Sequence, residues 1–309
     1  MTVETIASPR SLVRIVDRTG RAFAVISPRA ASLRMLTVYG LDLVEPAVAA
    51  GGHPGMAGAT LAPWPNRVED ATWWHNGNEL RLNLTEPELG NANHGLVTHD
   101  DFEVTDSADH AATLRTRIRH PQGYPFSLDL SVTYTMAESG VTVTTTVENR
   151  GSERAPVALG AHPYLRVGAT PADRLLVTVE ATHAYQLDER HIPRDRFAVN
   201  GTQWDLREPT NIAAAPAHGT FELAPATGTI VHSLQTEDGQ GVELWADPAY
   251  RWTQLYIDSD FPSDDGPRKA VAIEPMTAPP NALRSGEGLT WLEPGERWQV
   301  SWGIRLRSR

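Results

Sequence analysis

The sequence predicts an all-β protein built as a large antiparallel β-sandwich, and three observations point to this class. Apolar residues recur at every second position along many short segments, which is the spacing of a half-buried strand. Helical periodicity is scarce. The 24 glycines and 23 prolines suit the many turns that connect short strands. Because β-sandwiches of this length occur as single domains, we expect residues 1–309 to form one domain.

A hairpin in the middle of the chain is the clearest strand signal. Apolar residues alternate with polar ones over 128–134 and again over 141–147, and the turn-like Glu138-Ser139-Gly140 lies between the two runs. The same alternation predicts further strands at 114–118, 80–84 and 298–306. Four turn-rich segments are candidates for functional loops on this scaffold: 46–79, 90–100, 160–173 and 258–268.

Composition excludes several classes of function. The net charge of −11 argues against a nucleic-acid or anionic-membrane partner, because such partners require a basic surface. The chain has no cysteine, so disulfides, thiolate metal sites and a cysteine nucleophile are excluded. Residues 1–18 lack the apolar stretch of a secretory signal, and residues 48–65 are too weakly hydrophobic to span a membrane. We therefore expect a cytoplasmic protein.

Glu274 stands where a β-branched run meets a proline cluster. On a strand, Ala270, Ala272 and Glu274 would share one face, and the two alanines would leave space beside the carboxylate. A glutamate held on a rigid element beside a cavity is typical of a general base. The alternative is a solvated glutamate at the end of a strand, which by itself is the commoner arrangement.

Three other short segments place a polar side chain in a rigid or apolar setting. Asn66 and Arg67 follow Pro63-Trp64-Pro65, and the guanidinium suits an oxygen-rich ligand, although a salt bridge to Glu69 or Asp70 would also explain it. His94 ends an asparagine-rich turn, and an isolated turn histidine often has no function. His162 lies between small residues and a proline, where it is either a core histidine or a group that a ligand approaches closely.

These side chains form an acid–base set that needs no metal. The histidines show no HExxH pairing, and no acid stands at ligand spacing from His94 or His162, so we expect no zinc site. A serine triad lacks support because there is no Gly-x-Ser-x-Gly motif. Trp64 beside Arg67 is a candidate for stacking on a sugar ring, although most of the nine tryptophans are expected in the core.

Taken in order, these segments resemble the aldose 1-epimerases, or galactose mutarotases. The resemblance rests on PWPNR at 63–67, His94-Gly95, HPY at 162–164 and EPMT-x-PP at 274–280, and it covers the chain from about residue 40 to 304. It implies a large antiparallel β-sandwich that interconverts the α and β anomers of a free aldohexose of the glucose or galactose type. It also implies a monosaccharide substrate and no cofactor.

The resemblance also implies the individual site residues. Glu274 would be the general base at the C1 hydroxyl, and His162 the general acid at the ring oxygen. His94 and Arg67 would hold and polarise the ring oxygen and its neighbours, with Asn66 in support. Gln254 resembles a family glutamine that contacts the sugar near C1.

The stretch 217–222 departs from the family pattern, which has a sugar-binding aspartate near this point. His218 or Glu222 is the candidate to replace it, and the departure bears on sugar specificity more than on the acid–base chemistry. Two alternatives stay open. One is a hexose-6-phosphate 1-epimerase, which would need several cationic groups at the pocket. The other is a carbohydrate-binding protein of the same fold without turnover.

Overall fold

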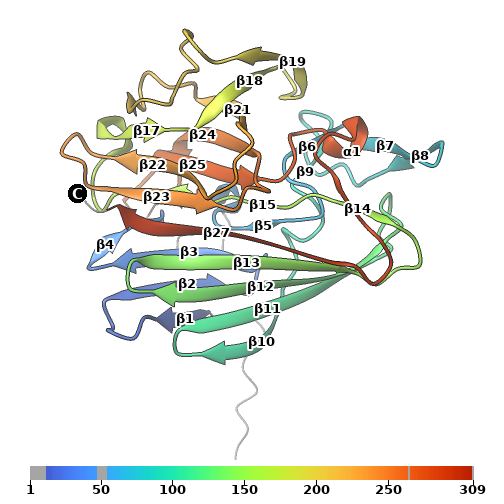
Figure 1. The fold of residues 1–309 in the computed structure, drawn as a ribbon, viewed down its shortest axis with the longest axis horizontal. Coiled ribbons are helices and arrows are strands. Elements are labelled where there is room, and N and C mark those ends of the chain that lie inside the picture. The colour runs from blue at the N-terminus through green and yellow to red at the C-terminus, as the bar shows by residue number, and fades with distance from the viewer. Residues whose placement is uncertain (1–11, 47–53, 264, 308–309) are drawn as a thin grey trace, which may run out of the picture.

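Antiparallel sheets make up nearly all of the regular structure in the computed structural model, which describes residues 12–46, 54–263 and 265–307 (Figure 1). The predicted all-β class is confirmed. Within the described ranges the only α-helix is α1 (Ala282–Ser285), and two short 3₁₀ turns cover Pro54–Met56 and Ala172–Arg174. In the same ranges, no helix has the length and apolar character needed to cross a membrane.

The largest sheet has nine strands and contains the hairpin expected from the alternating pattern. Val132 pairs with Thr145, and Tyr134 with Val143, across its two long strands. Every second side chain of this hairpin is buried, as the period of two requires. In spatial order the strands are β10 (Glu103–Ala108), β11 (Ala111–Arg119), β12 (Ser127–Ala137), β13 (Gly140–Asn149), β27 (Arg297–Arg307), β23 (Gly241–Ala246), β22 (Ile230–Gln235), β17 (Leu176–Thr178) and β20 (Thr210–Asn211). The strands expected at 114–118 and 298–306 are therefore confirmed as β11 and β27.

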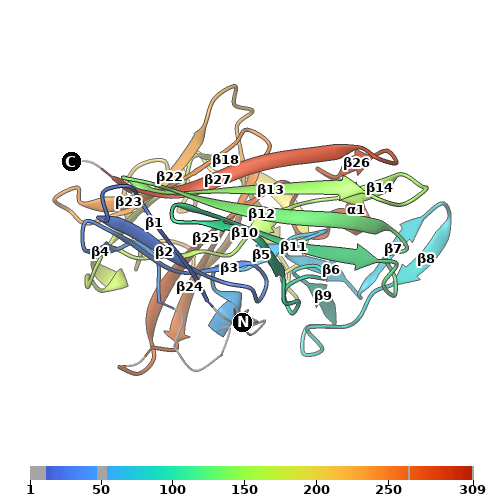
Figure 2. The ribbon, with the colours of Figure 1, turned by 90° about the horizontal axis from the view of Figure 1, so that it is seen from below.

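A second large sheet contains Gln254 and Glu274, together with the short strands on either side of His162. Its path is β19 (Pro193–Ala198), β18 (Ala181–Leu187), β21 (His218–Leu223), β24 (Trp252–Phe261), β25 (Arg268–Met276), β15 (Gly160–Ala161) and β5 (Thr60–Leu61), with β16 (Tyr164–Leu165) also paired to β25. In Figure 2 the strands β24 and β25 run across the direction of β12 and β13. Such crossing is typical of two sheets that pack face to face with their strands at a large angle.

Smaller sheets complete the structure. Strands β1 (Val13–Val16), β2 (Ala22–Ser27), β3 (Ser32–Val38) and β4 (Leu41–Asp42) form a four-stranded sheet that lies against β11, β12 and β13. Three pairs of short strands are β6 (Arg67–Glu69) with β9 (Asn91–Asn93), β7 (Thr72–His75) with β8 (Asn78–Arg81), and β14 (Ala155–Val157) with β26 (Thr290–Leu292). The apolar core is continuous between the sheets: Ile26, Val132 and Ile273, from three different sheets, belong to one buried cluster.

The strand expected at 80–84 is shorter than the alternation predicts. Strand β8 ends at Arg81, because its partner β7 begins at Thr72 and leaves no strand for later residues to pair with. Leu82 is buried, whereas Leu84 is 51% exposed, so the apolar alternation continues past the end of the ladder. The pattern located the strand but not its end.

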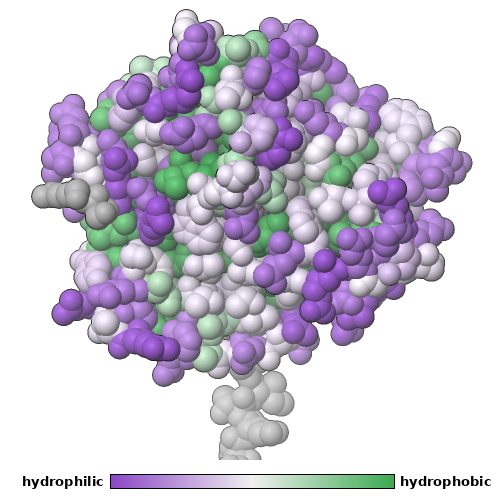
Figure 3. All heavy atoms as spheres, viewed as in Figure 1, coloured by the Kyte–Doolittle hydropathy of each residue, from purple (hydrophilic) through white to green (hydrophobic). Residues whose placement is uncertain are grey.

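The four turn-rich segments contain short strands rather than long irregular loops. Strands β5, β6 and β7 lie within 46–79, β9 within 90–100, and β15 and β16 within 160–173, while β24 and β25 enter the two ends of 258–268. Residues 47–53, and the 1–11 part of the expected signal-free N-terminus, lie outside the described residues. On the face seen in Figure 3, apolar side chains form small patches separated by hydrophilic ones.

Candidate active site

A cavity of about 280 Å³ opens over one face of the sheet that contains β24 and β25. It is lined by side chains from segments that are far apart in the sequence: Gly55, Met56, Asn66, Arg67, Glu86, Asn93, His94, His162, Tyr164, His191, His218, Gln254, Tyr256, Asp258 and Glu274. Seven of the eight predicted site residues are therefore brought together here. Larger depressions exist, and one of them lies over the nine-stranded sheet, where Asp129 pairs with Arg119 and Arg150.

Glu274 stands on β25 with its side chain almost completely buried, 2% exposed. Its strand neighbour Gln254 on β24 lies directly opposite, and Thr220 on β21 lies opposite Gln254 in turn. The backbone carbonyl of Glu274 accepts a hydrogen bond from the Thr253 hydroxyl, while Oε2 of its carboxylate is buried without a hydrogen-bond partner. A buried carboxylate oxygen without a donor is costly, and such atoms occur at functional sites.

The two alanines that share a face with Glu274 do not line the cavity themselves. Ala270 and Ala272 are buried in a cluster with Tyr164, and Tyr256 packs against this cluster. Ala272 is paired with Tyr256 on one side and Tyr164 on the other. The small side chains leave room for these two rings, and it is the tyrosines that line the cavity.

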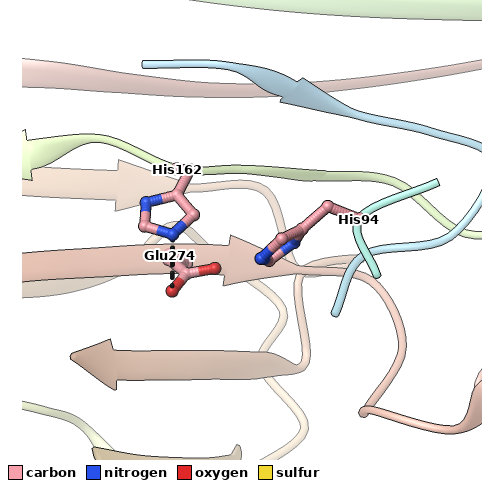
Figure 4. Close-up of side chains that lie close together, drawn as sticks. All are labelled: His94, His162 and Glu274. Carbon is pink, nitrogen blue, oxygen red and sulfur yellow. Dashed lines mark ion pairs between the residues drawn. The ribbon is translucent and has the colours of Figure 1, made fainter. Parts of the chain in front are cut away.

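His162 comes from the short connection between β15 and β16 and faces Glu274 directly (Figure 4). Its Nε2 lies 3.5 Å from Oε1 of Glu274, and the histidine is 5% exposed. The imidazole stacks on the ring of Tyr164, with centroids 5.1 Å apart and planes at 23°. The stack and the pairing of Tyr164 to β25 hold the imidazole over the carboxylate.

His94 points at the same pair from a third segment, just after β9 (Figure 4). Its ring is 5.3 Å from the ring of His162 in an edge-to-face arrangement. The backbone N–H of Asn66 donates to Nδ1 of His94, at 3.2 Å, and the backbone N–H of His94 donates to the carbonyl of Asn66. Because Nδ1 accepts a hydrogen bond, the proton of the neutral ring belongs on Nε2, so His94 is a donor toward the cavity.

Arg67 is held by a partner that the sequence did not reveal. Its Nε and Nη2 donate to the two carboxylate oxygens of Glu86 at 2.8 and 2.7 Å, rather than to Glu69 or Asp70. This bidentate geometry fixes the plane of the guanidinium. Asn66 adds a further constraint, since its side-chain oxygen accepts from the backbone N–H of Arg67.

Gln254 is the central amide of a buried network. Its Oε1 accepts from the Thr220 hydroxyl at 2.6 Å and from the Asn66 amide at 3.4 Å. Nε2 donates to the carbonyl of Leu255. The amide orientation is thereby set, which is how a substrate-contacting group is kept in place before the substrate arrives.

Burial sets the protonation of the site. Removal from water raises the pKa of Glu274 to about 8, although the nearby Arg67 acts in the opposite direction. The pKa of His94 is well below its usual value because of burial and the neighbouring charges of His162 and Arg67. Burial and the proximity of His191 lower the pKa of His218 to about 3. Near neutral pH, His94 and His218 are therefore uncharged donors and acceptors.

His94, His162 and Glu274 form one cluster in space that their spacing in the sequence does not indicate. Donor atoms of His94, His162 and Glu274 all lie within 4.8 Å of one another, a set that can hold a metal ion. To become a ligand, Nε2 of His94 would have to lose its proton while Nδ1 keeps the hydrogen bond from Asn66. The hydrogen bonding of this ring therefore suits proton donation better than metal ligation.

Replacement of Glu274 by Gln should make the protein more stable at alkaline pH. Between the unfolded value near 4.5 and the folded pKa of about 8, only the folded state keeps the proton, so the free energy of unfolding decreases as pH rises. The isosteric amide removes this loss, and the variant should exceed the wild type by a few kcal/mol at pH 8. Urea unfolding at pH 5 and at pH 8 measures the difference; equal pH dependence in both proteins would contradict a raised pKa.

Two predicted contacts are wrong. Trp64 is 1% exposed, packs against Tyr124 in the core and does not line the cavity. Glu222 cannot replace the family's aspartate, since its carboxylate is engaged by Arg196 and Arg251 away from the cavity. The other candidate, His218, does line the cavity.

Eight other residues that line the cavity were not predicted from the sequence. They are Gly55, Met56, Glu86, Asn93, Tyr164, His191, Tyr256 and Asp258. Tyr164 follows His162-Pro163, and Tyr256 and Asp258 alternate with Gln254 on β24, so the period of two could have identified these three. Nothing in the local sequence around Glu86 or His191 marks either residue.

Comparison with known proteins identifies the family of the chain. A model of the aldose 1-epimerase family matches residues 23–305. The chain is 31% identical over 288 residues to the uncharacterized protein YihR of Escherichia coli, covering 92% of this chain and 90% of that protein. The chain therefore belongs to the aldose 1-epimerase family.

Solved structures share the fold. A GalM/aldose epimerase homologue from C. elegans superposes with a TM-score of 0.85 at 18% identity, covering 96% of this chain and 98% of that one. A galactose 1-epimerase from Lactobacillus acidophilus gives a TM-score of 0.76 at 15% identity, covering 96% of this chain and 99% of that one. At these identities the likeness defines the galactose mutarotase-like architecture of the chain.

Proposed function

We propose that this protein is an aldose 1-epimerase that interconverts the α and β anomers of a free aldohexose of the glucose or galactose type. The observation that carries the proposal is the contact of 3.5 Å between His162 Nε2 and Glu274 Oε1 inside a buried cavity. The hydroxyl oxygen O1 and the ring oxygen O5 are both bonded to C1. A base for one and an acid for the other must therefore lie close together, as these two groups do.

Ring opening is a paired proton transfer in this arrangement. Glu274 removes the proton from O1, the C1=O1 bond forms, the C1–O5 bond breaks, and His162 delivers a proton to O5. Rotation about C1–C2 presents the other face of the aldehyde. Ring closure then returns the O5 proton to His162 and takes the proton back from Glu274, so both groups end as they began.

The raised pKa of Glu274 suits this chemistry. A carboxylate with a pKa of about 8 is a stronger base than an ordinary one and so takes a hydroxyl proton at a lower cost. The reactive form has an ionised Glu274 and a protonated His162, and it differs from the uncharged pair only by movement of one proton between the two groups. His94 is an Nε2–H donor, and its hydrogen bond would stabilise the negative charge that develops on the ring oxygen O5 as the C1–O5 bond breaks.

The charges of the cavity favour a free sugar over a phosphorylated one. Arg67 is the only arginine or lysine among the lining residues that the structure describes, and Glu86 already occupies two of its donors. Asp258 adds a negative charge to the lining. A phosphate group would meet few cationic donors here.

We expect the wild-type protein to act on glucose or galactose at least about tenfold more efficiently than on glucose 6-phosphate, which corresponds to about 1.4 kcal/mol in transition-state binding. NMR exchange spectroscopy at anomeric equilibrium measures both rates in the same buffer. Heat-denatured protein gives the uncatalysed background. A higher kcat/KM for the phosphorylated sugar would contradict the proposal for a free aldose, and sugar binding without accelerated exchange would identify a binding protein.

A further inference from the structure

His191 reaches the cavity from the tight turn that joins β18 to β19, and none of the family motifs includes it. Its backbone adopts φ 61°, in the left-handed region that residues other than glycine rarely occupy. Nδ1 of its ring is buried without a hydrogen-bond partner. A strained backbone and an unused polar atom at a cavity wall are the features of a residue placed for binding.

The turn is built to hold His191 in this position. Asp188 accepts hydrogen bonds at 2.9 Å from the backbone N–H groups of both Arg190 and Ile192, which flank His191. The backbone N–H of His191 donates to the carbonyl of Asp188, also at 2.9 Å. These hydrogen bonds hold the backbone from which the side chain of His191 projects toward the cavity.

Arg190 ties the same turn to the segment that precedes β9. Its side chain donates to the carbonyls of Leu89 and Gly90 at 2.8 and 2.9 Å, and it pairs with Asp70. Leu89 and Gly90 closely follow Glu86, which pairs with Arg67. The position of His191 is thus coupled to the arginine side of the cavity.

The imidazole of His191 meets that of His218 edge to face, with ring centroids 4.2 Å apart. His218 lies on β21, which is two strands from β25 and Glu274, so the backbones of these two residues are separated by roughly 10 Å across the sheet. A sugar whose C1 is at Glu274 would therefore direct its opposite edge toward the two imidazoles.

We infer that His191, together with His218, binds the hydroxyl groups of the sugar that lie across the ring from C1, and so determines selectivity at C4. Each uncharged imidazole offers one donor and one acceptor, the pair of functions that recognises a hydroxyl. Both rings are uncharged near neutral pH, since burial lowers the pKa of His191 as it does that of His218. This inference rests on the proposed function, because that function places C1 at Glu274.

The test compares glucose with galactose, which differ only at C4, and glucose with mannose, which differ only at C2. In His191→Ala we expect KM for the preferred C4 epimer to rise by about 3–10-fold with little change in kcat, the effect of losing a hydrogen bond to a neutral hydroxyl. The glucose-to-galactose ratio of kcat/KM should move toward one, while the glucose-to-mannose ratio stays constant. His191→Asn, which tolerates the left-handed backbone, should recover part of the selectivity.

His183→Ala is the matched control, because His183 lies on the neighbouring strand β18 and does not line the cavity. Calorimetry with the same sugars measures selectivity without turnover. Selectivity in binding that His191→Ala abolishes, in a protein without epimerase activity, would support the inference and overturn the proposed function. Normal turnover with an unchanged glucose-to-galactose ratio in His191→Ala, or a wild type that neither binds nor converts these sugars, would overturn the inference.

Discussion

Glu274→Gln is expected to lower kcat for anomer interconversion by about 10²–10⁴-fold, the usual contribution of a general base. The amide keeps the size of the carboxylate and its place on β25, so KM should change little. The amide cannot act as the proposed acceptor of the O1 proton, a role that we assign to the carboxylate whose Oε1 lies 3.5 Å from Nε2 of His162, the proposed acid. Polarimetry on freshly dissolved α-glucose or α-galactose measures the effect.

The control for Glu274→Gln is Glu222→Gln. Glu222 is also a buried carboxylate, on β21 of the same sheet, but it is paired with Arg251 and lies outside the cavity. We expect its replacement to leave kcat close to that of the wild type. Wild-type rates in Glu274→Gln would remove the proposed base from the mechanism.

His162→Asn should lower kcat by a similar factor of about 10²–10⁴, because the proton can then no longer be delivered to O5. The double variant with Glu274→Gln should be little slower than either single variant, since the two groups act on one bond as a unit. His232→Asn is the matched control: His232 is another buried histidine, on β22 of the nine-stranded sheet. Additive losses in the double variant would show that the two residues act in separate steps.

The strands could be predicted from the sequence because the alternation of buried and exposed side chains is a local property. Residues 128–134 and 141–147 alternate between the core and the surface, so each strand records in its own sequence which face is buried. The end of β8 could not be predicted from its own residues, because it depends on where the partner strand β7 begins. The ends of a strand depend on the strand with which it pairs, and the segment's own residues do not reveal where that partner begins.

The candidate site shows the same division. Asn66, Arg67, His94, His162, Gln254 and Glu274 stand in short rigid segments whose order resembles a family, and the structure gathers them around one cavity. Trp64 was misjudged because its neighbours in the sequence are site residues, whereas its neighbour in space is Tyr124. Glu86 was missed because its importance comes from the guanidinium of Arg67, nineteen positions away.

By itself, the sequence determined the all-β architecture and the segments that carry the proposed acid–base groups, because periodicity and backbone rigidity are local properties. Only the tertiary structure decided the pKa values, the tautomers and the contacts of these groups. It buried Glu274 so that its pKa rises to about 8, set the tautomer of His94 through Asn66, and brought His191 against His218. The physical reason is that desolvation, hydrogen bonding and ring contacts depend on what surrounds a group in space, and these surroundings come from strands far apart in the chain.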